Sequence, residues 1–194
     1  MTRRKLIIGA AVILAAILVT RNIKNLSLPS GNLIQNDLPS SSLSVSPEPL
    51  KDRPQVEIST PKGVFVIELR PDLAPKTITN FLSKWVNGYC DGKTFHRIED
   101  WVVQGCDPKG DGTGGADSLP TETSDTSFTA GSLGVARKPY PKTVSNDSQF
   151  FITKKDSLFL NGDYTYFGRV LSGMDVIEKL SAGDKIISTT ILSK

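Results

Sequence analysis

The fourteen residues TFHRIEDWVVQGCD, from Thr94 to Asp107, hold much of the side-chain chemistry of this 194-residue chain. They include the single histidine, His96, and one of the two cysteines, Cys106. Imidazole and thiolate are common zinc ligands, and together they can act as base and nucleophile in covalent catalysis. The same stretch carries Arg97 and Gln104, whose N–H groups can donate hydrogen bonds to a polar substrate. Three kinds of site are therefore open: metal, covalent and hydrogen-bonding.

Metal and covalent chemistry both lack the partners that they need. Cys90 and Cys106 stand 16 residues apart without a second cysteine pair, so a zinc site would need acidic ligands to complete it. A Cys–His or Ser–His pair would depend on His96 alone, with neither an orienting third group nor a G-x-S-x-G motif. What remains is Arg97, which is either a surface arginine on a strand or a donor to a substrate.

The glycine-rich segment GDGTGG, residues 110–115, is similar to a phosphate-binding loop only in composition. No Lys-Ser/Thr pair follows it, and no helix pattern begins there. Asp107, Asp111 and Asp117 miss the ligand spacing of an EF-hand and lack its closing glutamate. The segment is predicted to be a solvated turn.

The two cysteines leave the question of a disulfide open. Cys90 precedes one predicted strand and Cys106 ends the next, so a hairpin could bring the two segments together. Whether the sulfurs can bond depends on the distance and direction of the side chains, which the sequence does not give. Bridged and free cysteines are both compatible with the sequence.

A β-hairpin and a helix are predicted to precede this stretch. Residues 55–70 alternate between apolar and polar side chains on both sides of the turn residues TPKG, which predicts a hairpin. Pro75 suits the first turn of a helix, and the apolar residues after it follow the i, i+3, i+4 spacing of one helix face. Gly88 is predicted to end this helix, and Trp85 to lie in the core.

Short strands dominate the rest of the chain. They are predicted in the segments TFHRI, WVVQG, GSLGVA, SQFFIT, YTYFGRVL and KIISTTIL. One further helix is predicted from Met174 to Ser181. Many strands with two helices and abundant turn residues are typical of a mainly β fold, here a closed β-barrel with helices over its ends.

The N-terminal residues 1–25 are expected to be a targeting segment. The apolar run from Leu6 to Val19 follows Arg3, Arg4 and Lys5 and would rise about 21 Å as a helix, short of the roughly 30 Å of a hydrocarbon core. That length suits a signal sequence, but no small-x-small cleavage site follows. An uncleaved signal-anchor and a cleaved signal both remain open. Either one places the rest of the chain outside the cytoplasm, as a single-pass membrane protein or a secreted one.

Residues 26–54 are rich in serine and proline, which predicts a flexible tether and leaves residues 55–194 as the folded domain. The first 25 residues contain five basic groups and no acidic ones, so the net charge of +3 for the whole chain leaves −2 for the rest. The folded part is therefore not basic, and nucleic-acid binding is not expected.

The folded part resembles the cyclophilins, the cyclosporin-binding class of peptidyl-prolyl cis–trans isomerases. The resemblance runs from about Val56 to Leu192, in the order LRPDLAPKTITNFL, FHRIEDWVVQGCDPKGDGTGG, GSLGVAR, NDSQFFIT and FLNGDYTYFGRVLSGMDVIEKL. FHR followed by QG-x-D, G-T-G-G and SQFFI is a highly specific combination. The resemblance implies a closed eight-stranded antiparallel β-barrel capped by two α-helices. It also implies a peptide groove on the outer wall, with neither metal nor organic cofactor.

The resemblance implies catalytic roles for Arg97, Gln104 and Phe151. Arg97 would donate to the prolyl nitrogen of a twisted X–Pro amide, where a lone pair develops as resonance is lost. Gln104 would bond the substrate and support the arginine, whereas His96 would be structural. The positions that would bind substrate are Trp101, Val102, Ala136, Arg137, Gln149, Phe159, Leu160 and Tyr164, with Ala136 and Arg137 acting mainly through their backbones.

The chain departs from the usual residues of the family around this pocket. Trp101 stands where phenylalanine is usual and Val102 where methionine is common, which gives a larger flat wall beside a smaller one. Cys106 replaces a usual glycine, and the segment RKPYPKTVSND before SQFF is longer than usual. Phe159 occupies the site where tryptophan favours cyclosporin, which predicts weak inhibition of this chain by cyclosporin.

Together these features predict a monomeric prolyl isomerase, tethered to the membrane or secreted, that helps exported proteins fold. Its substrates would be proline-containing polypeptides. The alternative is a module that binds proline-containing segments with little turnover, and the altered wall at Trp101 and Val102 is the reason to consider it.

Overall fold

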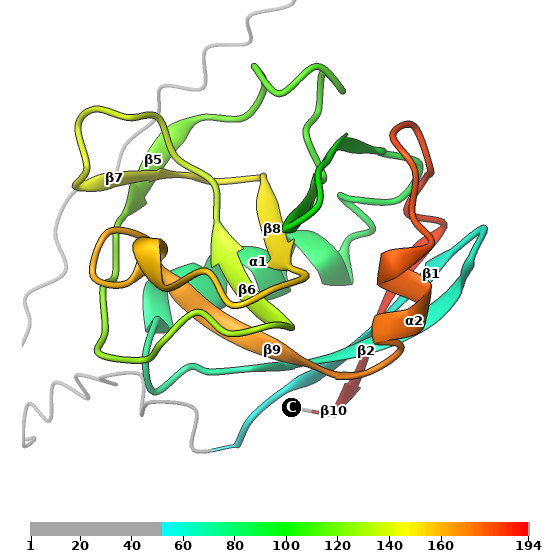
Figure 1. The fold of residues 1–194 in the computed structure, drawn as a ribbon, viewed down its shortest axis with the longest axis horizontal. Helices are drawn as coiled ribbons and strands as arrows, with labels where there is room; N and C mark the ends of the chain where they lie inside the picture. Colours follow the sequence, from blue (N-terminus) through cyan, green and yellow to red (C-terminus); the bar gives the residue numbers. More distant parts are fainter. Residues whose placement is uncertain (1–51, 194) are drawn as a thin grey trace, which may run out of the picture. The chain divides into compact units, whose positions relative to one another are not determined.

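The computed structural model describes residues 52–193, which form a curled β-sheet with two α-helices (Figure 1). The predicted targeting segment and nearly all of the predicted tether lie outside these described residues. Neither of the two helices in the described part has the length and apolar content that a bilayer crossing requires.

The predicted hairpin is present as β1 (Gln55–Thr60) and β2 (Gly63–Leu69). The strands pair in antiparallel register, with Val56 opposite Ile67 and Ile58 opposite Phe65. Successive side chains of a strand point to opposite faces, so the apolar set of each strand enters the core together. All four of these side chains are fully buried.

Both predicted helices are present, one of them shorter than predicted. Helix α1 (Pro75–Val86) begins at the proline, whose missing N–H removes no intrahelical bond there. Helix α2 (Met174–Glu178) ends three residues before the predicted Ser181. The reason is that Lys179 and Leu180 donate to carbonyls three residues earlier, so the backbone tightens out of the α-helical pattern.

In the described part of the chain, eight antiparallel strands form one sheet in the order β10-β1-β2-β9-β6-β8-β4-β3. The strands after the hairpin are β3 (Phe95–Ile98), β4 (Val102–Gly105), β6 (Ser132–Val135), β8 (Phe150–Thr153), β9 (Tyr166–Ser172) and β10 (Ser188–Ser193). The fold is mainly β with eight antiparallel strands in its main sheet, as predicted.

The prediction that the barrel is closed was wrong, because the edge strands β3 and β10 do not pair with each other. The chain leading into β10 bonds instead to the first residue of β3 and to the chain before it: Phe95 donates to the Asp184 carbonyl and Ile186 to that of Lys93. The sheet is therefore a half-barrel whose open side is filled by irregular backbone.

Two short strands and one short helix were not predicted. Strands β5 (Asp117–Pro120) and β7 (Val144–Asn146) form a separate two-stranded sheet, and η1 (Leu158–Leu160) is a 3-10 turn. The sequences DSLP and VSN are too short and too polar to show a strand pattern.

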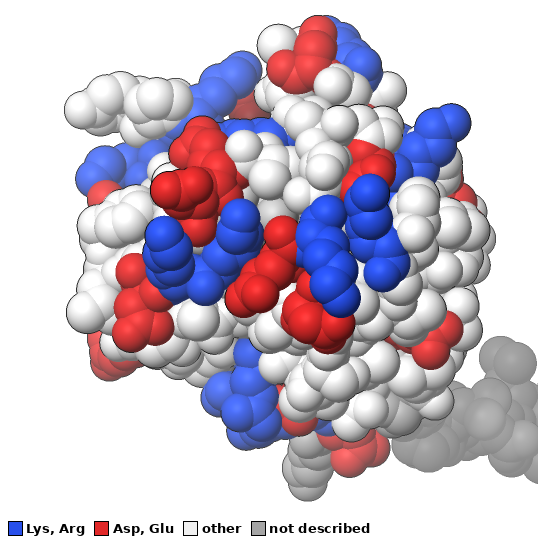
Figure 2. Space-filling view, turned by 45° about the vertical axis from the view of Figure 1, so that its right-hand side comes forward, with Lys and Arg blue, Asp and Glu red and all other residues white. Residues whose placement is uncertain are grey.

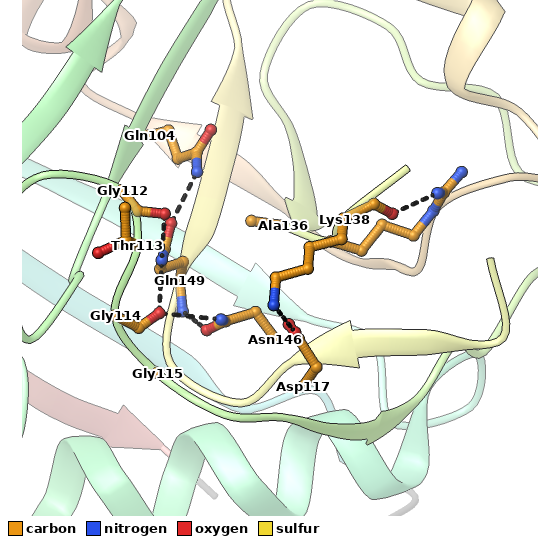
Figure 3. Close-up of a pocket in the computed structure, with 11 residues that line it drawn as sticks. Gln104, Gly112, Thr113, Gly114, Gly115, Asp117, Ala136, Lys138, Asn146 and Gln149 are labelled. Atoms are coloured by element: carbon orange, nitrogen blue, oxygen red, sulfur yellow. Dashed lines mark hydrogen bonds and ion pairs between the residues drawn. The ribbon is translucent and has the colours of Figure 1, made fainter. Parts of the chain in front are cut away.

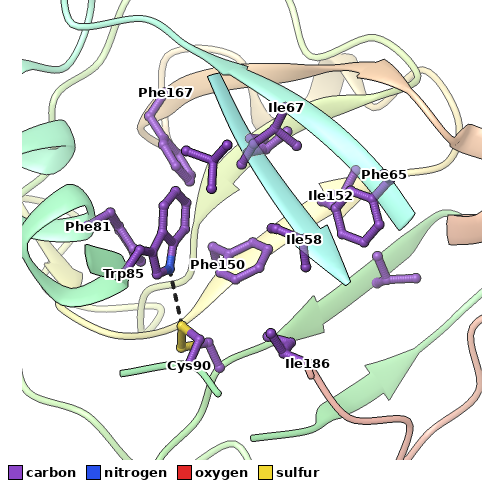
Figure 4. Close-up of a cluster of buried hydrophobic side chains, with 14 of the residues drawn as sticks. Ile58, Phe65, Ile67, Phe81, Trp85, Cys90, Phe150, Ile152, Phe167 and Ile186 are labelled. Atoms are coloured by element: carbon purple, nitrogen blue, oxygen red, sulfur yellow. Dashed lines mark hydrogen bonds between the residues drawn. A yellow bond between two sulfur atoms is a disulfide. The ribbon is translucent and has the colours of Figure 1, made fainter. Parts of the chain in front are cut away.

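The main core lies between the sheet and the two helices, and aromatic rings occupy much of it (Figure 4). Phe81 and Trp85 of α1 meet rings from the sheet: Phe81 stacks on Phe167 at 5.1 Å, and Trp85 meets Phe150 edge-on at 5.7 Å. The prediction that Trp85 is a core residue is confirmed, since it is 1% exposed.

A disulfide joins Cys90 to Cys106, which answers the question that the sequence left open. Their Cα atoms are 5.1 Å apart, within the usual range for a bridge. Cys106 has a φ of 65°, in the left-handed region that favours glycine. A glycine, which the resemblance makes usual at this position, would fit that backbone, and in this chain the bridged cysteine adopts it.

Candidate active site

Strands β4 and β8 divide their side chains between the main core and a second apolar cluster on the other face of the sheet. Val103 and Phe150 belong to the core, whereas their neighbours Val102 and Phe151 belong to the second cluster. The alternation of a strand produces this division without any break in the backbone. The second cluster forms the floor of the candidate site and includes Phe128, whose ring lies 5.9 Å from that of Phe151.

A pocket of about 70 Å³ opens above this floor, and we call it the central pocket. It is lined by Arg97, Trp101, Val102, Gln104, Ala136, Arg137, Phe151, Leu160 and Tyr164. All nine were predicted from the resemblance as catalytic or substrate-binding residues. The other two predicted residues, Gln149 and Phe159, line the two pockets that flank it.

The first flanking pocket, the glycine-loop pocket, has a volume of about 300 Å³ (Figure 3). It is lined by Gln104, Gly112, Thr113, Gly114, Gly115, Asp117, Ala136, Arg137, Lys138, Asn146 and Gln149. The second, the aromatic pocket, has a volume of about 430 Å³. It is lined by Arg97, Trp101, Arg137, Pro139, Tyr140, Lys142, Phe159, Leu160, Asp163 and Tyr164.

Aromatic rings make the walls of the central pocket. Phe151 is 4% exposed, and Tyr164 meets it edge-on at 5.8 Å. Gly134 of the neighbouring strand β6 lies opposite Phe151 of β8. A Cβ atom at Gly134 would overlap the phenyl ring. The ring can therefore occupy its place only because residue 134 has no side chain. A small pocket with such aromatic walls suits a compact apolar ring.

Arg97 is held at the mouth of the pocket by two side chains. Its Nε donates to Glu99 Oε1 at 2.7 Å, and its Nη1 donates to Gln104 Oε1 at 3.2 Å. Arg97 and Gln104 also face each other across the β3–β4 ladder. These bonds use two of the five guanidinium N–H donors, so the group can be oriented and still donate to a substrate.

Glu99 was not among the predicted residues, although it orients two of them. Its Oε2 accepts a bond from Trp101 Nε1 at 2.9 Å while its Oε1 accepts the bond from Arg97. The hydrogen bond from Arg97 is the main cause that lowers the pKa of Glu99 from its ordinary value. The signal was present in the sequence, since Arg97, Glu99 and Trp101 stand two residues apart.

Gln149 connects Gln104 to the glycine-rich segment (Figure 3). Gln104 Nε2 donates to Gln149 Oε1 at 2.8 Å, and Gln149 Nε2 donates to the Gly114 carbonyl at 2.7 Å. Asp107 in turn accepts the backbone N–H groups of Asp111 and Gly112. The predicted solvated turn is thus partly a support for the site, a role that its composition did not indicate.

The side chain of Arg137 has a structural role that was not predicted. It is 3% exposed, lies 4.3 Å from the Tyr164 ring centroid, and donates to the carbonyls of Lys138 and Asp163. The backbone of Ala136 is already engaged, because its N–H bonds the Gln149 carbonyl and its carbonyl accepts from Asn146. Backbone contacts to substrate were predicted for both Ala136 and Arg137. Since the backbone of Ala136 is already bonded, such contacts would have to come mainly from Arg137.

His96 lies outside all three pockets, in agreement with the structural role predicted for it. Among the described residues neither ring nitrogen has a hydrogen-bond partner. Burial is the main cause that lowers the pKa of His96, so the neutral ring is favoured. The described residues also contain no group of acidic, histidine and cysteine side chains that could hold a metal ion.

Comparison with known proteins agrees with this geometry. Residues 55–192 match the family model described as cyclophilin type peptidyl-prolyl cis-trans isomerase/CLD. A peptidyl-prolyl cis-trans isomerase of Schizosaccharomyces pombe is 45% identical over 132 residues, covering 64% of this chain and 83% of its own. One from Arabidopsis thaliana is 40% identical over 147 residues, covering 71% of this chain and 87% of its own.

Solved structures show the same fold. The crystal structure of a cyclophilin type peptidyl-prolyl cis-trans isomerase from Cryptosporidium parvum has a TM-score of 0.68 and 30% identity. It covers 74% of this chain and 99% of its own. Another structure of that protein, determined in the presence of the dipeptide Ala-Pro, has a TM-score of 0.66. The chain belongs to the cyclophilin-type peptidyl-prolyl cis-trans isomerase family.

Proposed function

We propose that this domain accelerates rotation about X–Pro bonds by holding the proline ring in the central pocket under the Arg97 guanidinium. The observation that carries the proposal is the position of Arg97, fixed by Glu99 and Gln104 at the mouth of a small aromatic pocket. The pocket would fix the ring while the rest of the peptide turns.

The chemistry requires no covalent step. An X–Pro bond rotates over a barrier of about 18–20 kcal/mol, because twisting the amide ends its resonance. The prolyl nitrogen then carries a lone pair, to which a permanently charged donor such as Arg97 can hydrogen-bond. This bond forms only in the twisted state, so it lowers the barrier and not merely the energy of the bound peptide. Each factor of ten in rate needs about 1.4 kcal/mol.

Gln104 and Gln149 would fix the guanidinium in the direction that the twisted amide needs. Gln149 is 3% exposed and bonded to the glycine-rich segment, so it is a rigid anchor for Gln104. An oriented donor loses less conformational freedom on meeting the transition state than a free one does.

Exchange spectroscopy by NMR on a proline-containing peptide tests this proposal with the full chain. The cis and trans signals should exchange faster in the presence of the protein, and Arg97→Ala should reduce the catalysed rate about 100-fold. Arg169→Ala is the matched control, since Arg169 is a half-exposed arginine of β9 outside the pockets. Loss of activity in both variants, or in neither, would refute the role of Arg97.

We further propose that the domain acts outside the cytoplasm on exported proteins, either tethered to the membrane or secreted. Two observations support this: basic residues precede the apolar run of the first 25 residues, and a disulfide joins Cys90 to Cys106. Mass spectrometry of the mature N-terminus, with protease treatment of intact cells, tests both parts. A chain that resists external protease and stays reduced in the cell would contradict the proposal.

The alternative function is a module that binds proline-containing segments with little turnover. The observation that favours it is Glu99, which bonds both Arg97 and the unusual wall residue Trp101 and would restrain the arginine in this alternative. Peptide-induced shifts in the protein spectrum, without exchange between the cis and trans signals of the peptide, would support this alternative over the enzyme.

A further inference from the structure

The aromatic pocket lies directly beside the central pocket, and the proposed isomerisation does not use it. The two pockets share five residues: Arg97, Trp101, Arg137, Leu160 and Tyr164. A peptide whose proline occupies the central pocket would therefore have a neighbouring residue at the aromatic pocket. With about 430 Å³, this second pocket has room for a large side chain.

The loop after β6, which includes Pro139, Tyr140 and Lys142, forms one wall of this pocket. Hydrogen bonds from side chains fix its position. Arg137 Nη1 donates to the carbonyls of Lys138 and Pro139, at 2.8 and 3.2 Å. Lys142 Nζ, further along the loop, donates to Asp163 Oδ2 at 2.6 Å. These bonds hold Tyr140, which lies between them in the sequence, at the rim of the pocket.

The charged groups of the pocket already have partners within the protein. Arg97 is paired with Glu99, and both Arg137 and Lys142 reach Asp163. An acidic side chain entering here would have to compete with these carboxylates and would lose its own hydration. Charge therefore gives little reason for an acidic residue to prefer this site.

What the pocket offers instead is exposed aromatic surface. Tyr140 is 80% exposed and Phe159 is 68% exposed, and both line the pocket. The ring of Trp101 meets that of Phe159 edge-on at 5.1 Å, which makes a corner of two aromatic faces. An aromatic side chain can pack into such a corner both through its apolar area and through favourable ring geometry.

The position of Arg97 indicates which residue of the peptide reaches this pocket. Arg97 lines the central and aromatic pockets but not the glycine-loop pocket, whereas Gln104 lines the central and glycine-loop pockets. Under the proposed function Arg97 donates to the prolyl nitrogen, and a further N–H donor of the same guanidinium would then lie within reach of the carbonyl of the proline. That carbonyl leads to the next residue, so the chain after the proline leaves on the side of the aromatic pocket.

We propose that the aromatic pocket binds the side chain that directly follows the proline, and that it favours an aromatic residue there. The preferred substrate is then an X–Pro–aromatic segment. This inference rests on the proposed isomerase function and adds a substrate class to it.

The test compares three peptides that differ only after the proline: Ala-Ala-Pro-Phe-Ala, Ala-Ala-Pro-Ala-Ala and Ala-Ala-Pro-Glu-Ala. Exchange rates are measured by NMR with the full chain and divided by the rate of each peptide alone. The phenylalanine peptide should be turned over with a kcat/KM about fivefold above that of the alanine peptide. The glutamate peptide should show no such gain.

Tyr140→Ala should reduce this preference to about twofold, because it removes one aromatic wall of the pocket. Tyr140 is almost fully exposed, so its loss should leave the fold intact, which circular dichroism can check. Leu158→Ala is the matched control: Leu158 is 57% exposed beside Phe159 but does not line the pocket. This control should keep the full preference.

The outcomes separate the two proposals. If none of the peptides is turned over, the proposed function fails. If all are turned over but phenylalanine gives no gain, or glutamate gives the largest, the aromatic-pocket inference fails alone. It also fails if Ala-Phe-Pro-Ala-Ala, with phenylalanine before the proline, shows the same Tyr140-dependent gain.

Discussion

At the scale of single residues, the groups that line the central pocket are a guanidinium, amides and aromatic or aliphatic side chains, and the carboxylate of Glu99 orients two of them from outside it. Arg97 supplies the hydrogen-bond donors of a planar guanidinium, and Gln104 and Gln149 supply amide donors and acceptors that do not ionise. The side chains that looked most reactive in the sequence, His96 and Cys106, have no place in the three pockets. Cys106 forms the disulfide with Cys90, and the half-buried His96 belongs to β3 beside Arg97.

The sole histidine is expected to titrate below its ordinary pKa of about 6.5. Burial is the main cause that lowers the pKa of His96; Asp107 and Asp111 oppose it, and Arg97 adds to it. Below about pH 6.5 the unfolded chain then binds more protons than the folded one. The contribution of His96 to the free energy of unfolding should therefore be fully present above about pH 6.5. It should be lost as the pH falls through the lower pKa of the folded state.

Because His96 is the only histidine, one imidazole signal in an NMR titration reports its pKa directly. Denaturant unfolding at about pH 7 and about pH 5 measures the linked loss of stability. A pKa at or above the ordinary value would show that burial does not dominate the titration of His96.

At the scale of elements, the pairing of β6 with β8 builds the floor of the site. Gly134 faces Phe151 across the ladder, and the absent side chain leaves the space that the ring fills. Gly134→Ala should displace the ring and reduce kcat/KM about tenfold or more, because the pocket would no longer fit the proline. The measurement is the NMR exchange rate, with thermal unfolding to verify that the variant folds. An unchanged rate in a folded variant would show that Phe151 is not the floor of the active pocket.

The elements that the sequence predicted correctly are those with a clear local pattern. The hairpin β1–β2 shows alternation, and α1 shows helical spacing with a proline at its start. Barrel closure was predicted wrongly, since local alternation does not say whether two edge strands meet. Strands β5 and β7 were missed for two reasons. They are far apart in the sequence, although they pair with each other, and neither has an apolar pattern of its own.

The same holds for the candidate site: residues within recognisable motifs were predicted, whereas residues that act through contacts between distant segments were not. The predicted residues came from matching motifs, and the structure gathers all of them around three adjoining pockets. Glu99 and Phe128 were missed because their roles are contacts to other side chains, from a strand end and from a loop. The aromatic pocket could not be predicted either, since its wall depends on bonds from Arg137 to carbonyls of the following loop.

At the scale of the whole molecule, charge is spread rather than concentrated on the face drawn in Figure 2, where basic and acidic side chains lie next to one another. Independently of that view, the described residues form ion pairs at the surface, such as partly exposed Arg70 with Asp72 at 2.6 Å and exposed Lys179 with Asp175 at 2.9 Å. Exposed pairs of this kind contribute about 0–1 kcal/mol each to stability. The fold therefore depends mainly on its aromatic core and on its one cross-link.

Removing that cross-link should lower the stability of the whole domain. The disulfide closes a loop of 16 residues between the end of α1 and the end of β4, for which about 3 kcal/mol is typical. Denaturant unfolding of the Cys90→Ala/Cys106→Ala variant measures this loss. The pair Cys90→Ala/Cys106→Gly should recover about 1 kcal/mol of it, because glycine adopts the positive φ of residue 106 without strain. Equal stability of the two variants would contradict that explanation of residue 106.

The central claim is that Arg97 stabilises the twisted X–Pro amide through directed hydrogen bonds. Its most direct test is NMR exchange spectroscopy on one proline-containing peptide with the parent chain, Arg97→Lys and Arg97→Ala, at matched peptide occupancy. We predict a loss of about 100-fold in the catalysed rate for Arg97→Ala and an intermediate loss for Arg97→Lys, which keeps the charge without the planar set of donors. Peptide binding should change much less than the rate. A catalysed rate that is the same in all three proteins would contradict this role of Arg97.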